Sequence, residues 1–168
     1  MTNIKIKDSV LKEAAQNSFA DFLNVIIDAI NNGIGGHLDS DTMNELNADQ
    51  ITLLAYKTLC DEISVGGFVQ LIYNGYGPFI FKNPFARILK NWGLVPLGQI
   101  IQKAHKYYGK YHSIIECEMD YDEFMALYER CPEFDEFDDE FVASEDKYTH
   151  LIASYVDNNI HNFITIED

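Results

Sequence analysis

Apolar side chains recur at helical spacing along almost the whole chain, and this periodicity limits the possible folds more than any other feature. In residues 9–32, for example, Leu11, Phe22, Ile26 and Ile30 fall on one side of a helix that Gly33 would end. A helix with one apolar face has to bury that face against another element. We find no convincing strand pattern, so we predict an all-α fold with at least six helices and less than ~10% strand.

Capping residues and glycines mark where several of these helices begin and end. Asn47 and Asn83 are suited to N-capping, and Asp120 followed by Glu123 resembles a capping box. The pair Gly66-Gly67 interrupts an apolar helix, so we expect at least one of the two glycines to adopt a positive φ.

The length of 168 residues is typical of one compact domain, and we predict a multi-helix single domain over residues 1–168. No apolar stretch approaches the ~20 residues that cross a bilayer, and the first residues do not form a secretory signal. The three cysteines, Cys60, Cys117 and Cys131, are odd in number and lack metal-site spacing. They are therefore interpreted as reduced thiols of a cytoplasmic protein.

The charge of the chain is unevenly distributed. The net charge is −15, but residues 116–146 alone hold 14 acids and one base, whereas residues 63–115 hold no acid at all. A field of this kind repels DNA and anionic membranes and attracts cationic partners. The sequence therefore indicates a protein-binding module that neither binds nucleic acid directly nor associates with a membrane.

We regard the acids of this segment as candidates for partner binding. Phe134, Phe137 and Phe141 recur at helical spacing among them, which indicates that the acids are held against a core and are not part of a disordered tail. Fourteen carboxylates along ~46 Å of helix average one per ~3.3 Å, close to the ~3.4 Å phosphate spacing of one DNA strand. The candidates are Asp120, Asp122, Glu123, Glu133, Asp135, Glu136, Asp138, Asp139, Glu140, Glu145 and Asp146. The side chains of Asp138, Asp139 and Glu140 are expected to point away from the phenylalanines.

A metal site has weak support in the sequence. His37, Asp39 and Asp41 alternate as the first ligands of a calcium loop do, but Asn44 stands where that loop needs glycine and Gln50 where it needs glutamate. We interpret this segment as a solvated loop and helix cap. We expect no metal and no cofactor.

Catalysis has equally weak support. His105, His112 and Cys117 are the residues on which a hydrolytic enzyme would have to rely, but no orienting group or oxyanion donor accompanies them. The glycines do not form a phosphate-binding loop between a strand and a helix. We therefore predict a protein that is not an enzyme and retain hydrolysis as the less favoured alternative.

The motif Gly66-Gly67-Phe68, with Gln70 and Asn74 after it, resembles the signature of a bacterial domain of unknown function. The best-known members of that family are small acidic DNA-mimic proteins. The physical interpretation of the motif is structural: the glycines allow a sharp turn, Phe68 fills the core, and Gln70 and Asn74 bond the freed backbone groups.

The resemblance extends over about residues 47–163, including the acidic run at 134–141, and a helix at about 9–32 is expected to pack on this region. It implies an all-helical, often dimeric protein that occupies the DNA-binding surface of a transcription regulator. The alternative is an immunity or antitoxin protein that neutralises a basic nuclease. The role of the basic stretch at 82–110 and the identity of the partner stay open.

Overall fold

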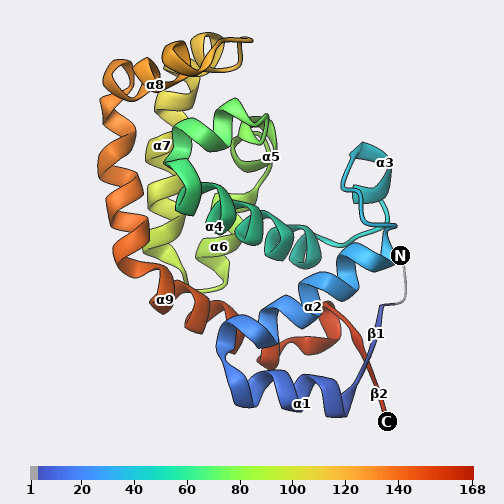
Figure 1. The fold of residues 1–168 in the computed structure, drawn as a ribbon. Coiled ribbons are helices and arrows are strands. Elements are labelled where there is room, and N and C mark those ends of the chain that lie inside the picture. The colour runs from blue at the N-terminus through green and yellow to red at the C-terminus, as the bar shows by residue number, and fades with distance from the viewer. Residues whose placement is uncertain (1–3) are drawn as a thin grey trace. The chain divides into compact units, whose positions relative to one another are not determined.

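The computed structural model describes residues 4–168, which are 78% helical and contain only two short strands (Figure 1). This confirms the all-α prediction. The elements in chain order are β1 (Lys5–Lys7), α1 (Asp8–Asn17), α2 (Phe19–Gly33), α3 (Ser40–Met43), α4 (Ala48–Tyr73), α5 (Gly77–Phe81), α6 (Phe85–Asn91), α7 (Val95–Ile115), α8 (Tyr121–Arg130), the 3-10 helix η1 (Pro132–Phe134), α9 (Asp135–Asn158), the 3-10 helix η2 (Ile160–Asn162) and β2 (Thr165–Glu167). Within this described part, no helix is long and apolar enough to span a bilayer.

The chain forms two compact units, and the first combines residues 1–54 with residues 146–168. In this unit β1 and β2 pair in parallel, with Lys5 opposite Thr165 and Lys7 opposite Glu167. The sequence did not reveal this pair, because strands of three residues are too short to show an alternating pattern. The expectation of a single domain concerns how the two units are joined, and it stays a prediction.

The helix expected at residues 9–32 is in fact two helices, α1 and α2, and this part of the prediction is wrong. Ser18 separates them, because its backbone is extended (φ −164°, ψ 164°) and its side chain accepts a hydrogen bond from the Asp21 N–H at 2.9 Å. Serine is a preferred N-cap residue, since its hydroxyl can satisfy one of the free N–H groups at a helix start. Apolar residues recur at helical spacing on both sides of Ser18 because both helices contribute to the core of the same unit.

The second unit, residues 55–145, is built around aromatic side chains. Phe68, Phe134 and Phe141 are 0% exposed, and the rings of Phe68 and Phe134 stack with centroids 5.9 Å apart. Figure 1 shows α7 running beside the first half of α9, and the ring of Tyr107 on α7 lies 5.8 Å from that of Phe137 on α9. The predicted phenylalanine stripe is therefore the inner face of the acidic helix.

The acidic run belongs to α9, which continues without interruption over 24 residues. The acids at its beginning lie in the first turns of a helix, where negative charge is favoured by the helix dipole. No glycine or proline occurs between residues 133 and 158, so nothing in the local sequence breaks the helix. The acidic run therefore has the rigidity of a long helix.

Candidate functional site

The acids of residues 116–146 differ greatly in their exposure. Eleven of the 14 are exposed and three are only partly exposed, so most of the array is available to a partner. The exposed acids are Glu116, Glu118, Asp120, Asp122, Glu123, Glu129, Asp135, Glu136, Asp139, Glu140 and Asp146, and the partly exposed ones are Glu133, Asp138 and Glu145. All except Asp146 belong to the second unit.

Two of the exposed acids also hold the start of α8. Asp120 accepts a hydrogen bond from the Glu123 N–H at 2.9 Å, and Glu123 accepts one in return from the Asp120 N–H at 3.1 Å. This confirms the expected capping box and satisfies two backbone donors at the helix start. Each of the two carboxylates thus fixes the helix while it faces solvent.

Among the acids of residues 116–146, Glu133 forms an ion pair with a lysine of the same chain. Its Oε1 accepts hydrogen bonds from Lys110 Nζ at 2.8 Å and from the Tyr111 hydroxyl at 2.9 Å. Hydrogen bonds from these two donors favour the ionised form and lower the pKa of the Glu133 carboxyl to about 2. Glu133 therefore links α7 to η1 and contributes little free negative charge to the array.

Asp138 does not point into solvent, which corrects our expectation for its side chain. Its Oδ1 accepts a hydrogen bond from the Phe68 N–H at 2.9 Å. The pKa of the Asp138 carboxyl is raised to about 7, mainly by burial and to a smaller extent by the charges of Asp135 and Asp139, although the hydrogen bond from Phe68 acts in the opposite direction. Position 138 follows Phe134 by four residues and precedes Phe141 by three, so helical geometry places it on the inner face. This spacing was the available sign in the sequence.

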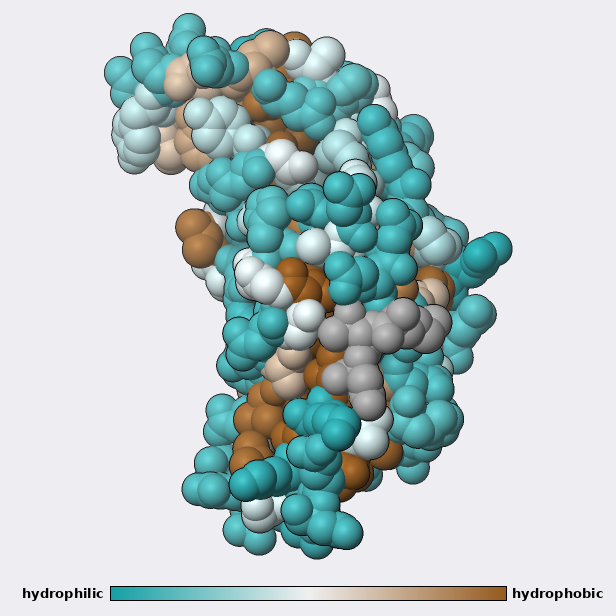
Figure 2. All heavy atoms as spheres, turned by 90° about the vertical axis from the view of Figure 1, so that its right-hand side faces the viewer, coloured by the Kyte–Doolittle hydropathy of each residue, from teal (hydrophilic) through white to brown (hydrophobic). Residues whose placement is uncertain are grey.

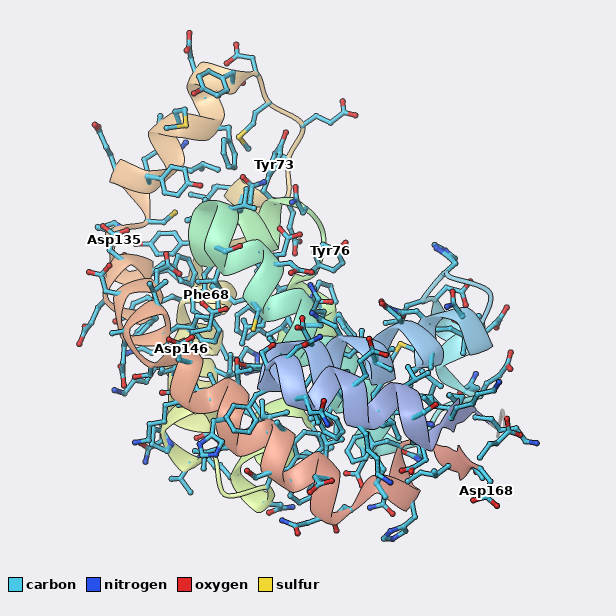
Figure 3. All side chains as sticks on the ribbon, turned by 60° about the horizontal axis from the view of Figure 1, so that its bottom comes forward. Phe68, Tyr73, Tyr76, Asp135, Asp146 and Asp168 are labelled. Carbon is cyan, nitrogen blue, oxygen red and sulfur yellow. The ribbon has the colours of Figure 1, made fainter. Side chains whose placement is uncertain are left out.

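The backbone that Asp138 caps is the kink inside α4 (Figure 3 labels Phe68, which follows it). Gly67 has φ 70° and ψ −166°, which confirms the expected positive φ, whereas Gly66 has an extended φ of −167°. The Tyr128 hydroxyl on α8 donates to the Gly66 carbonyl at 2.9 Å. Residues of α8 and α9 therefore satisfy the backbone groups that the kink releases from α4.

Gln70 and Asn74 do not perform the role that we expected for them at this turn. Gln70 Nε2 donates to Asn74 Oδ1 at 3.0 Å, and Asn74 Nδ2 donates to Glu62 Oε2 at 2.7 Å. The side chains of Glu62, Gln70 and Asn74 are thus hydrogen-bonded to one another across the kink. The backbone groups of the kink are bonded by Tyr128 and Asp138. Sequence reasoning missed Tyr128 because its partner lies 62 residues away in the chain.

Residues considered for metal binding or catalysis take part in structural contacts, and His37 Nε2 lies 3.8 Å from Asp39 Oδ2. Asp39 caps α3, accepting from the Asp41 and Thr42 N–H groups at 2.9 Å, as expected for a helix cap. His105 stacks on Phe81, and the Cys117 thiol donates to the Ser113 carbonyl in the last turn of α7. In the part of the chain that the structure describes, no group of three or more His, Cys, Asp or Glu side chains could hold a metal ion.

Three exposed acids of α9 form a regular face. Glu136, Asp139 and Glu140 are spaced at i, i+3 and i+4, which places them together on the side opposite the phenylalanines. Like charges at this spacing destabilise a helix by some tenths of a kcal/mol, so the packed phenylalanines have to offset their repulsion. The arrangement can attract and orient a cationic surface without any chemical step.

The structure thus defines an all-helical protein with an array of exposed carboxylates on its helices. Comparisons with known proteins agree with this class. A family model described as DMP19-like protein matches residues 44–159. The chain is 32% identical over 127 residues to the DNA mimic protein DMP19 of Neisseria meningitidis serogroup B (strain ATCC BAA-335 / MC58), and the aligned region covers 75% of this chain and 77% of that protein. The chain therefore belongs to the DMP19-like protein family, and the resemblance to DNA mimics is confirmed.

Proposed function

We propose that this protein is a DNA mimic whose exposed carboxylates occupy the basic surface of a DNA-binding protein such as a transcription regulator. The observation that carries the proposal is the array of exposed acids held on the rigid helices α8 and α9. The name of the relative, a DNA mimic protein, supports it. Binding of this kind needs no cofactor, and the protein acts by competing with DNA for one surface.

The effective array is smaller than the sequence indicates. Glu133 is paired with Lys110, and Asp138 is turned inward to cap the backbone of α4. We therefore assign partner binding to the exposed acids and a structural role to these two. The best acids to test are Glu136, Asp139 and Glu140, because all three are exposed and lie together on one face of α9.

We expect the triple variant Glu136→Gln, Asp139→Asn, Glu140→Gln to associate with the partner at least about tenfold more slowly at low salt, since surface charge mainly sets the association rate. The partner is obtained by affinity capture from a lysate of the source cell at two salt concentrations and is then purified. Association is measured by surface plasmon resonance, and competition is measured as release of the partner from its own DNA.

The matched control is Glu13→Gln, Asp21→Asn, Asp28→Asn, which removes the same charge from exposed positions of α1 and α2. Equal rates for the triple variant and the wild type would contradict the proposal. Capture of a basic nuclease in place of a regulator would support the immunity-type alternative. Carboxylates lack the condensed counterions of duplex DNA, so binding to this protein should depend less steeply on salt than binding of the partner to DNA.

We further propose that the protein is a homodimer. Lys103 and Lys106 on α7 are exposed and have no acidic partner within residues 4–168, so they are available to an acidic surface of a second copy. Sedimentation velocity at micromolar concentration is expected to give twice the chain mass of 19.2 kDa. The dimer should weaken as salt increases, because screening weakens exposed ion pairs. A species of 19.2 kDa at every salt concentration would contradict this proposal.

A further inference from the structure

The outer side of α8 presents two apolar side chains to solvent. Tyr121 is 74% exposed and Met125 is 45% exposed. They are four residues apart in one helix, so the two side chains are neighbours on the same face. An exposed tyrosine and an exposed methionine side by side are a small apolar patch of the kind found at the centre of protein interfaces.

The helix that carries this patch is held firmly in the second unit. The Phe124 ring lies 4.7 Å from that of Tyr73, which Figure 3 shows at the end of α4. Leu127 is fully buried, and the Tyr128 hydroxyl bonds the Gly66 carbonyl. Tyr121 and Met125 are therefore exposed because the inner face of α8 is already occupied by other side chains. A partner would meet a surface that is formed in advance.

Acids border the patch on its solvent side. At 100° per residue, Glu129 and Asp122 follow Met125 around the circumference of α8, and both are exposed. In Figure 2, the end of the molecule that Figure 1 identifies with α8 shows tan apolar residues among teal hydrophilic ones. An apolar centre with an acidic border is complementary to a surface that has an apolar centre and a basic border.

We propose that Tyr121 and Met125 form the apolar anchor of the partner-binding surface and receive the apolar side chains of a cationic amphipathic helix in the DNA-binding partner. This rests on the proposed function. Helices that read the major groove combine Lys and Arg with apolar side chains that contact thymine methyl groups. Carboxylates alone can imitate the phosphates, whereas the apolar pair takes the place of the base edges. The apolar contact adds affinity that salt does not screen.

The test uses two defined peptides of equal length and equal positive charge. In one, lysines alternate with leucines that form a single helical face, and in the other glutamine replaces every leucine. We expect the wild-type protein to bind the leucine peptide at least about fivefold more tightly, which is the loss expected when an interface anchor is truncated. The ratio should persist as salt increases. Binding is measured by fluorescence anisotropy of labelled peptides.

The variant Tyr121→Gln, Met125→Gln is expected to bind both peptides equally, with its affinity for the glutamine peptide unchanged. The variant Tyr121→Phe, Met125→Leu keeps the apolar area and should behave as the wild type. A matched control, Val95→Gln with Val142→Gln, changes residues that are 45% and 57% exposed on other helices and should leave the ratio intact.

Each other outcome has a definite meaning. If the wild type binds the glutamine peptide without preferring leucine, or if the control variant loses the preference equally, the anchor proposal is overturned and the proposed function is not. If the wild type binds neither peptide at low salt, both are overturned. If the Tyr121 and Met125 variant keeps its peptide preference but changes its sedimentation, the patch is a contact between copies of this chain, and the anchor proposal is again overturned.

Discussion

Replacement of Gly67 by alanine is expected to lower the free energy of unfolding by about 3 kcal/mol or more. Its φ of 70° and ψ of −166° lie in a region that only glycine adopts readily, and other residues pay about 1–3 kcal/mol there. A β-carbon on Gly67 would also lie 2.1 Å from Asp138 Oδ2 and 2.6 Å from its Cγ. The Asp138 side chain would have to move, which would release the Phe68 N–H.

Urea unfolding followed by circular dichroism measures this change, and the chain supplies a matched control. Gly109 lies inside α7 with open space around its Cα, so Gly109→Ala should stabilise the protein by about 1 kcal/mol. A double-mutant cycle with Asp138→Ala separates two contributions to the loss of stability, the steric clash between the new β-carbon and the Asp138 side chain and the backbone strain at position 67. A loss below about 1 kcal/mol for Gly67→Ala would show that the kink is not constrained as described.

Asp138 is expected to make the stability of the protein depend on pH between about pH 4 and pH 7. Its pKa is raised from 3.8 to about 7 in the folded protein, so the folded state retains a proton that the unfolded chain loses. The unfolding free energy therefore falls as pH rises through this window, by up to about 1.4 kcal/mol per pH unit, and levels off above it. Asp138→Asn cannot ionise, but its amide oxygen can still accept from the Phe68 N–H.

The difference between the wild type and Asp138→Asn isolates this effect from the other titrating groups. Between pH 5 and pH 8 we expect the wild type to lose about 2–3 kcal/mol relative to the variant, measured by urea unfolding at four pH values. Asp139→Asn removes the same charge at an exposed neighbouring position and should give a profile close to that of the wild type. Parallel profiles for the wild type and Asp138→Asn would mean that Asp138 is ionised throughout.

These two residues also show why the acidic run cannot be treated as a uniform surface. Asp138 and Asp139 are adjacent in sequence and identical in chemistry, but only Asp138 meets the backbone of α4. A variant that neutralises both would mix a stability effect with a binding effect. Glu136, Asp139 and Glu140 therefore give a cleaner test of the proposed function than any set that contains Asp138.

The sequence alone determined the features that depend on residues within about one helical turn of each other. The all-α class and the burial of Phe134, Phe137 and Phe141 followed from periodicity. The capping box at Asp120 and the positive φ within Gly66-Gly67 followed from local backbone chemistry. At Ser18 two local signals disagreed. The apolar spacing predicted one continuous helix, whereas the Ser18 cap divides it into α1 and α2.

Only the tertiary structure decided which groups close the kink and which acid a lysine of the same chain neutralises. Asp138 bonds Phe68 across 70 residues, and Tyr128 bonds Gly66 across 62. Lys110 neutralises Glu133 because α7 and η1 lie side by side. Such pairs form when packed helices bring distant residues together, so neither residue carries a local sign of its partner. The number of acids in the segment is therefore known from the sequence, whereas the number of acids available to a partner depends on packing.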